Sequence, residues 1–514
     1  CQPRSHPFTK LEKKLLTKKI STMKKHIIRL FSLLALFLGA AGCQKDFLEV
    51  QPQGEINAEN YFQTADHATW AVNAVYNQLR AWDVIAFPYL AMTDIVSDDA
   101  TKGSFPADAQ RIATFDNFTY GPSFPEEVRV AWRGYYRGIF RANSAIEGIP
   151  KAQMNEMLRS RLIGEAKFLR AHYYFNLVRW FGDIPLIDKQ LTEAEFYTKP
   201  RAPKAEVYNL IIQDLKDAIE VLPEKNQYPT ADMGRATKGA ARGVLAKVYL
   251  TIGDFVNAEQ YALQVINSNQ YALLPQYNRI FLPEGENSSE SVFEIQATAL
   301  EDSYNGATAW NMIQGVRGTP NLGWGFNLPS DDLIAAYEPG DPRRDATILY
   351  VGEVLPDGSG IVQDNPDILN ERYSQKAWTP NHPGLQDNGP SNIRILRYAD
   401  VLLIAAEALN ENDKPAQALT YINLVRARAR GTRPPSVVPA LTTTDKVQLR
   451  QAIWRERRVE LAMEQQRWFE LVRTGQAATR LTPLGFVAGK HELFPIPQSE
   501  IDLTGGIITQ NPNY

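Results

Sequence analysis

Apolar residues recur at spacings of three and four over long stretches of the chain, which is the pattern of helices that bury one face. In the clearest stretches, alanine and aromatic residues share that face, so small side chains on one helix can lie beneath large ones on its neighbour. These stretches occur largely as pairs separated by short turns. The predicted helices cover residues 64–80, 126–149, 156–181, 204–222, 236–252, 254–269, 394–411, 413–430, 446–463 and 465–474.

Two of these helix pairs match each other in sequence. At a constant offset of 159 positions, Leu245, Ala246, Leu250 and Asp254 correspond to Ile404, Ala405, Leu409 and Asp413. The helix that follows matches after one inserted residue, with Ala258, Tyr261 and Val265 against Ala418, Tyr421 and Val425. Such pairs are the unit of tetratricopeptide-like repeats. The alternative is two unrelated amphipathic hairpins.

Three regions lack a helical period. Residues 270–393 form a long stretch rich in Gly, Pro, Asn and aromatic residues, residues 82–125 are similarly irregular, and residues 431–445 form a connector rich in Pro and Thr. Irregular segments of such length within a compact protein usually carry function, so we expect a ligand site in the first of them.

The N-terminal part of the chain predicts export. Residues 1–22 precede the first internal Met, and we interpret them as a non-native upstream extension. Residues 23–42 have the positive start, short apolar run and small residues of a signal peptide. The apolar run is too short to span a bilayer. It ends at Cys43 after Ala40, Ala41 and Gly42, which predicts a lipoprotein whose acylated Cys43 begins a tether over residues 43–55. The alternative is a secreted protein with a chance Cys.

Charge and cysteine content exclude several kinds of function. The chain has 514 residues and a formal net charge of −3, but residues 1–42 hold 9 Lys and Arg against 1 Asp and Glu. The remainder therefore has 46 basic and 57 acidic side chains, a formal net charge of −11. That balance opposes nucleic-acid binding. If lipid occupies Cys43, no thiol remains in the mature chain for a disulfide, a thiolate metal site or a nucleophile.

Six stretches of the sequence, in this order, resemble the SusD/RagB family. They are residues 164–186, 234–240, 341–343, 397–403, 456–471 and 510–514. The resemblance implies an all-α fold of about four tetratricopeptide-like helix pairs with a large irregular ligand-binding lobe, here a domain of residues 56–514. Its scaffold would lie mainly in 56–269 and 394–475 and its lobe mainly in 270–393. The resemblance also implies a lipid-anchored protein of the outer membrane, exposed on the cell surface, whose partner is a SusC-like TonB-dependent transporter.

Charged residues of the signature stretches are better explained by structure than by catalysis. Glu456, Glu460 and Glu464 alternate with Arg455, Arg457, Arg458 and Arg467 at spacings that allow pairs within one helix. We expect this network to be partly buried and to fix the helix register. The aromatic residues from Tyr173 to Phe181 are similarly expected in the core.

The sequence gives little support for an enzyme. Glycoside hydrolysis needs two convergent carboxylates, whereas the pairs Asp98–Asp99, Glu126–Glu127 and Asp331–Asp332 are adjacent in sequence and more typical of solvated or helix-capping acids. The His residues are scattered without metal-binding spacing, and no phosphate-binding loop or nucleophile elbow is present. We therefore expect no catalytic residue, no metal and no cofactor.

Sugar binding requires flat aromatic rings beside polar side chains, displayed on loops. Within 270–393 the candidate ligand-binding residues are Trp310, Asn311, Arg317, Trp324, Phe326 and Asn327, with nearby glycines expected to leave the rings exposed. Phe118 and Tyr120 are further candidates in the other irregular stretch, and Trp82 and Trp378 remain possible. The alternative for any single ring is that it closes the core of the lobe.

These features predict a surface lipoprotein that binds oligosaccharides or polysaccharides and delivers them to the transporter. Peptides or glycopeptides, as the RagB-like members suggest, are the alternative ligands. A surface glycosidase is less well supported because paired acids are missing. An intracellular tetratricopeptide adaptor would not need the signal peptide.

Overall fold

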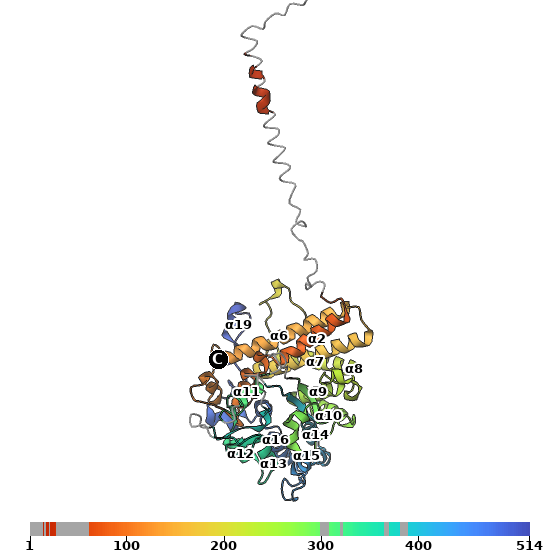
Figure 1. Cartoon of the computed structure of the whole chain (residues 1–514), viewed down its shortest axis with the longest axis vertical. Coiled ribbons are helices and arrows are strands. Elements are labelled where there is room, and N and C mark those ends of the chain that lie inside the picture. Colours follow the sequence, from red (N-terminus) through yellow and green to blue (C-terminus); the bar gives the residue numbers. More distant parts are fainter. Residues whose placement is uncertain are drawn as a thin grey trace, which may run out of the picture. The chain divides into compact units, whose positions relative to one another are not determined.

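The computed structural model describes residues 14, 17–19, 21–26, 61–298, 308–318, 322–363, 370–380 and 389–514. The chain divides into two compact units, Cys1–Tyr61 and Phe62–Tyr514. In the first unit the residues described before Tyr61 are helical. Cys43, together with most of the predicted signal peptide and tether, lies outside the described residues. The second unit holds the elements that follow (Figure 1).

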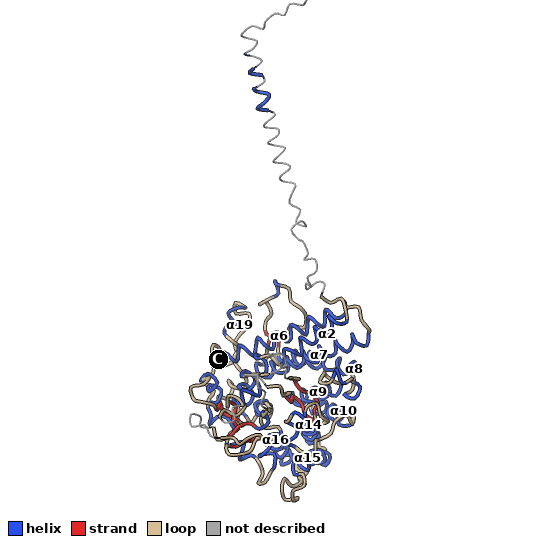
Figure 2. Tube along the Cα trace, in the orientation of Figure 1, coloured by secondary structure: helices blue, strands red, loops and turns tan. Residues whose placement is uncertain are grey.

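The second unit is mostly helical, and its strands are few and short (Figure 2). Its α-helices are α2 (Ala65–Leu79), α3 (Trp82–Ile85), α4 (Phe87–Leu90), α5 (Ala113–Asp116), α6 (Glu126–Gly148), α7 (Glu156–Phe181), α8 (Lys204–Val221), α9 (Lys238–Ile252), α10 (Phe255–Asn267), α11 (Trp310–Gln314), α12 (Asp331–Ala336), α13 (Pro342–Thr347), α14 (Tyr398–Glu411), α15 (Pro415–Arg430), α16 (Lys446–Glu460), α17 (Arg467–Arg473), α18 (Ala477–Leu481) and α19 (Gln498–Leu503). Its strands are β1 (Ala100–Gly103), β2 (Ile184–Pro185), β3 (Arg201–Ala202), β4 (Ser291–Ile295), β5 (Phe326–Pro329), β6 (Ile348–Tyr350), β7 (Arg372–Ser374) and β8 (Ile393–Arg397).

Eight helices form the scaffold as a continuous row of four pairs. α2 packs on α6, α7 on α8, α9 on α10 and α14 on α15, and each pair also contacts the next (Figure 1). The all-α, tetratricopeptide-like fold that the sequence predicts is confirmed. Ten helices of the structure fall within the ten predicted ranges. One boundary was wrong, because residues 394–397 belong to strand β8, which pairs with β4 before α14 begins at Tyr398.

Local signals set the ends of these helices. The side chain of Asn155 accepts hydrogen bonds from the backbone of Met157 and Leu158 at the start of α7, and Thr237 caps α9 in the same way. α9 ends at Gly253, whose φ of 79° is a left-handed conformation that glycine adopts without steric cost. Caps of this kind make the scaffold helices predictable from the sequence.

The two matching hairpins are adjacent in the structure, since α10 packs on α14. Leu245 and Ala246 are buried in α9, as are their counterparts Ile404 and Ala405 in α14. The turns differ at the insertion, because Asp254 caps α10 whereas Asp413 has a positive φ of 60° and Pro415 begins α15. The sequence match therefore corresponds to two structurally equivalent helix pairs rather than to unrelated hairpins.

Helix α7 carries the aromatic signature and lies at the centre of the core. Tyr173, Tyr174 and Trp180 are fully buried, and each donates one hydrogen bond to a backbone carbonyl, namely those of Val75, Ile187 and Met92. Buried tyrosine and tryptophan residues need such partners for their polar atoms. The expectation that these residues are structural is confirmed.

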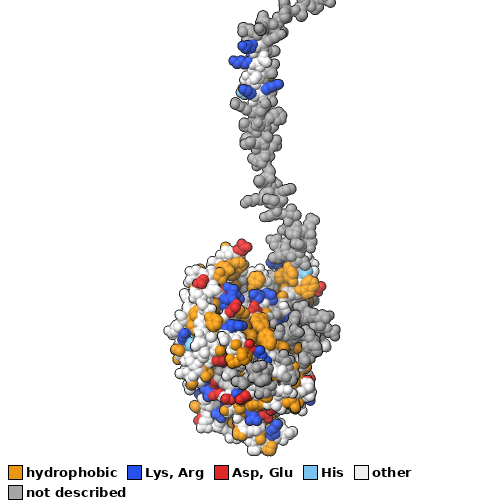
Figure 3. All heavy atoms as spheres, turned by 60° about the vertical axis from the view of Figure 1, so that its left-hand side comes forward, with side chains coloured by type: hydrophobic (Ala, Val, Ile, Leu, Met, Phe, Trp, Pro, Cys, Tyr) orange, Lys and Arg blue, Asp and Glu red, His pale blue; other side chains and the backbone are white. Residues whose placement is uncertain are grey.

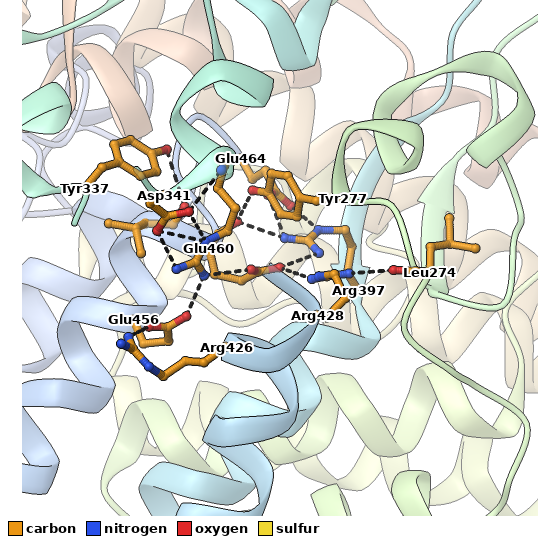
Figure 4. Close-up of polar contacts among 12 residues, drawn as sticks. Leu274, Tyr277, Tyr337, Asp341, Arg397, Arg426, Arg428, Glu456, Glu460 and Glu464 are labelled. Carbon is orange, nitrogen blue, oxygen red and sulfur yellow. Dashed lines mark hydrogen bonds and ion pairs between the residues drawn. The ribbon is translucent and has the colours of Figure 1, made fainter. Parts of the chain in front are cut away.

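A buried ionic network joins α16 to the lobe and to α15 (Figure 4). Glu460 accepts hydrogen bonds from Arg428 at 2.5 Å and from Arg343 and Arg397 at 3.1 Å each. Glu464 binds Arg397, and Glu456 binds Arg343 and Arg426. Burial of the network was expected, but the partners of these acids come from other elements and not from the same helix. The network therefore fixes the packing of α16 against other elements and does not form the intrahelical pairs that the sequence suggested.

Candidate functional site

A cavity of about 580 Å³ opens where the two irregular regions meet. Strand β1 of the first region pairs antiparallel with β5 of the second, with Gly103 opposite Phe326, and this pairing brings the two walls together. The cavity is lined by Phe87, Asp108, Ala109, Arg317, Gly318, Gly323, Trp324 and Phe326. Its walls thus come from both regions that lacked a helical period.

Three aromatic rings, those of Phe87, Trp324 and Phe326, line the apolar side of this cavity, and Trp82 packs against two of them. Trp324 stacks on Phe87 with ring centroids 6.0 Å apart and an interplanar angle of 26°, and Phe87 meets the edge of Phe326 at 4.8 Å. Trp82 lies 6.1 Å from Trp324 and is 47% exposed, which leaves it accessible to a ligand. The exposed ring of Trp82 and the partly exposed ring of Trp324 give apolar surface, a partner for the C–H faces of a sugar.

The polar side of the cavity is formed by an arginine that is held in place by its neighbours. Arg317 donates a hydrogen bond to the hydroxyl of Ser104 at 2.7 Å and forms an ion pair with Asp108. The Ser104 hydroxyl in turn lies 3.1 Å from Oδ2 of Asp108. Because Arg317 and Asp108 are the charged lining residues and they neutralise each other, the cavity offers hydrogen bonds without a net charge.

Backbone pairing fixes the position of Trp324. Its N–H donates to the carbonyl of Met312 at 2.7 Å, just inside α11, and Gly325 donates to Gly315. A Cβ added to Gly323 would lie 2.3 Å from the Met312 oxygen. Gly315 and Gly323 therefore allow two backbone segments to approach closely; they were expected instead to leave rings exposed. The approach sets Trp324 beside the cavity.

Several of the predicted ligand-binding residues are buried and bind other parts of the chain. Trp310 is 5% exposed, so its ring offers no face to a ligand and the expectation of an open platform there is wrong. Asn311 donates to the carbonyl of Ala377, and Asn327 donates to Asp94 and to Gln314. Phe326 lines the cavity but is only 3% exposed. Trp324 and Arg317 are the predicted residues that line the cavity with accessible surface.

Phe118 and Tyr120 lie in the core, away from the cavity. Both are buried, and their rings pack among Trp468, Phe494 and His491 of the C-terminal part of the chain. The prediction that they bind the ligand was wrong, because the irregular segment around them packs against the C-terminal part of the chain. Trp378 is likewise buried, in a small cluster of the lobe.

The sequence did not single out Phe87 and Asp108 as site residues. Phe87 lies in an irregular stretch in which other rings are buried, and Asp108 acts through Arg317, far away in the sequence. For Trp82 its position was a signal, since it comes shortly after the end of α2 at Leu79 and begins the short helix α3. A large aromatic residue in that place has little core to enter.

The adjacent acid pairs are engaged by arginines. Asp98 accepts two hydrogen bonds from Arg467 at 2.6 and 2.8 Å, and Asp99 accepts one from Arg458 at 2.7 Å. Burial alone would raise the pKa of Asp98, but the hydrogen bond and charge of Arg467, with Arg458, hold it well below its usual value. Among the described residues, no three His, Cys, Asp or Glu side chains lie close enough to hold a metal ion.

A carboxyl group behind the cavity gives a prediction on pH. Asp94 is fully buried beside Asn327 and Gln465, and burial raises its pKa to about 7. Because the folded chain holds this proton more tightly than the unfolded chain, Asp94 lowers stability as the pH rises from about 4 to 7. We expect Asp94→Asn to equal the wild type at pH 4 and to exceed its free energy of unfolding at pH 8 by about 2–4 kcal/mol.

The measurement is denaturant unfolding of both proteins across this pH range. Taking the difference between them cancels the titration of the other buried groups, such as Asp116, whose pKa burial raises to about 7 as well. A constant difference at all pH values would contradict the prediction.

In the part of the chain that the structure describes, no helix combines the length and the apolar character needed to cross a membrane.

Two family models match different parts of the chain. Residues 289–514 match the model of the SusD family, and residues 46–250 match a family described as starch-binding and associating with the outer membrane. A SusD-like protein P2 from Formosa agariphila is 31% identical over 96% of this chain and 100% of its own length.

Solved structures give a similar result. A laminarin-binding SusD-like protein has a TM-score of 0.75 and 31% identity, covering 88% of this chain and 100% of its own. The surface glycan-binding protein A from Bacteroides thetaiotaomicron, in complex with laminarihexaose, has a TM-score of 0.73 and 27% identity over 88% of this chain and 100% of its own.

Proposed function

Since this chain belongs to the SusD/RagB family, we propose that it is a cell-surface lipoprotein that binds oligosaccharides or polysaccharides and passes them to a SusC-like TonB-dependent transporter. It acts by binding alone, without catalysis. The observation that carries the proposal is the cavity between the two irregular regions, where Trp324 lines the wall together with the fixed Arg317 and the exposed ring of Trp82 packs against Trp324.

Laminarin and related neutral glucans are the first ligands that we propose. Support comes from the two similar structures named for laminarin binding or holding laminarihexaose. The pairing of Arg317 with Asp108 also favours an uncharged ligand, because a charged sugar would have to break that pair to reach the guanidinium. Hydroxyl groups can instead accept and donate hydrogen bonds around it.

The test uses Gln44–Tyr514, produced without the lipid cysteine, on an immobilised panel of plant, host and microbial glycans with peptide pools on the same panel. We expect selective binding to a neutral glycan, with no shortened product released into solution. Binding to peptides alone would favour the peptide or glycopeptide alternative. Release of cleaved glycan would make the protein a glycosidase.

The lipid anchor has a separate test in the native cell. We expect Cys43→Ala to move the protein from the membrane fraction to the soluble fraction. Stable anchoring needs more than one acyl chain, Cys43 is the residue that would carry these chains, and no thiol follows it in the sequence. Fractionation with immunoblotting measures this. The Trp324→Ala variant is the control and should stay with the membrane. Retention of the Cys43→Ala protein would show that another contact holds it there.

A further inference from the structure

A second hollow, of about 590 Å³, runs along α2. It shares no lining residue with the cavity described above. One wall is α2 itself, from Trp70 to Arg80. The facing wall is the segment 231–235 together with the end of β4 and Gln296. We call this hollow the α2 groove. In Figure 1, α2 lies beside α6 and α7 at one edge of the scaffold.

Exposed aromatic surface marks one end of the α2 groove. Trp70 is 54% exposed, although a ring of this size would normally be buried by folding. The facing Met233 is 56% exposed. Trp70 is followed at helical spacing by Asn73 and Asn77, which therefore lie on the same face of α2. An indole ring and two amides thus share one wall.

The polar groups of the groove are held in fixed positions. Arg235 binds Glu165 at 2.9 Å and Asp232 at 2.8 Å, and it donates to Oδ1 of Asn73 at 2.9 Å. Asn77 accepts from Arg80 through its own Oδ1. Within the described part of the chain, neither Asn73 nor Asn77 uses its side-chain N–H groups in a hydrogen bond. These donors remain available to a ligand.

The α2 groove leads toward the first cavity. Arg80 lines the groove and Trp82 belongs to the aromatic cluster of the cavity, and two residues of chain reach at most about 7 Å. From Trp70 to Arg80 the helix advances about 15 Å. An extended ligand that passes Trp82 would therefore meet Arg80, Asn77 and Asn73 along α2 before it reaches the ring of Trp70.

We propose that the α2 groove is a second carbohydrate subsite, with Trp70 as its platform, and that it binds a distant part of the same neutral glycan chain that the first cavity holds. The inference rests on the proposed function. It assigns the protein a preference for long chains, because only these reach both sites, and binding at two linked sites raises overall affinity without new contacts at either one.

The experiment measures affinity by calorimetry against a length series, namely laminaribiose, laminarihexaose and laminarin, for the wild type and for Trp70→Ala. We expect Trp70→Ala to weaken laminarin binding by about tenfold, the loss of one aromatic platform, and to leave laminaribiose binding unchanged. Asn77→Ala should show the same dependence on length with a smaller effect. Phe140→Ala, also 54% exposed but on α6 and outside both sites, is the matched control and should change nothing.

The two proposals fail in different ways. If the wild type binds laminarin and Trp70→Ala binds every length equally well, the second subsite is excluded while glycan binding stands. An equal loss for short and long chains would also exclude it, since Trp70 would then act on the first cavity. If the wild type binds another neutral glycan of the panel and not laminarin, the same comparison is made with short and long chains of that glycan; if it binds no glycan at all, both proposals fall. Thermal melts of both variants check that the fold is kept; we expect no change, because Trp70 is exposed.

Discussion

Replacing Glu460 with alanine should lower the free energy of unfolding by about 3–5 kcal/mol, the largest loss that we expect from any single change in the chain. Three arginines, Arg343, Arg397 and Arg428, bind this carboxylate, and their guanidinium groups are almost wholly buried. Removing the acid leaves positive charges in the core with too few partners, and desolvated charges without partners are costly. Denaturant unfolding followed by circular dichroism measures the loss.

The pH dependence of this loss is a further check. Burial would raise the pKa of Glu460, but Arg428, Arg397 and Arg343 outweigh it and lower the pKa to about 2. Its stabilising effect is therefore complete above the ordinary value of about 4.5 and disappears as the pH falls toward 2. The difference between wild type and Glu460→Ala should shrink over the same range.

A surface ion pair supplies the matched control for Glu460→Ala. Glu156 pairs with Arg159 and its side chain is 75% exposed, so Glu156→Ala should cost less than about 1 kcal/mol. If the two variants lost equal stability, the buried network would have no special role. Figure 4 shows why we expect otherwise, since the side chains from several elements converge on the Glu460 carboxylate.

The largest effect on binding should come from removing Trp324, which lines the first cavity, together with Trp82, which packs against it. We expect the double variant Trp82→Ala, Trp324→Ala to lose about 100-fold or more in glycan affinity, because each lost aromatic contact costs roughly 1–3 kcal/mol at a binding site. Trp82→Ala alone should lose about 5- to 150-fold. Calorimetry with laminarihexaose measures both.

Two controls separate loss of contact from loss of fold. Phe196 is 44% exposed, close to the value for Trp82, and lies outside the first cavity, so Phe196→Ala should bind normally. Because Trp324 also packs against the core, the melting temperature of the double variant is measured alongside. Unchanged affinity in a folded double variant would remove these rings from the site.

The surface of the protein helps to explain why exposed rings alone do not identify a site. On the face that carries α19, hydrophobic side chains gather in patches among basic and acidic ones (Figure 3). Exposed Phe140, Phe196 and Tyr197 border one further hollow there, between α6 and the C-terminal residues. The arginines of α6 on its rim, Arg133 and Arg137, are paired with acids. What distinguishes the first cavity is the combination of stacked rings with a fixed polar group.

The scaffold could be predicted from the sequence because its information is local. Helical spacing of apolar residues, the caps at Asn155 and Thr237, and the glycine at 253 act within a few residues of each helix end. The error at residues 394–397 follows from the same rule, because this short run continues an amphipathic pattern but pairs with β4, about a hundred residues earlier in the chain.

The candidate site could be predicted only in part. Its region and two of its lining residues with accessible surface, Trp324 and Arg317, follow from the aromatic and polar composition of residues 270–393. Composition does not tell which ring is buried. Trp310 is buried. Trp324 lies beside the cavity because Gly315 and Gly323 pack closely and because β1 pairs with β5. These are long-range events with no signal at the residues themselves.

The link between the site and the end of the chain bears on how the protein matures. The segment that leads into β1 is held by residues near the C-terminus, since Asp98 binds Arg467 and Asp94 binds Gln465. Contacts between such distant residues form slowly and require most of the chain. A nascent chain can thus complete its first helix pairs while the segment that leads into β1 is not yet held in place. The wall of the cavity that β1 supplies is then among the last parts of the fold to take its final position.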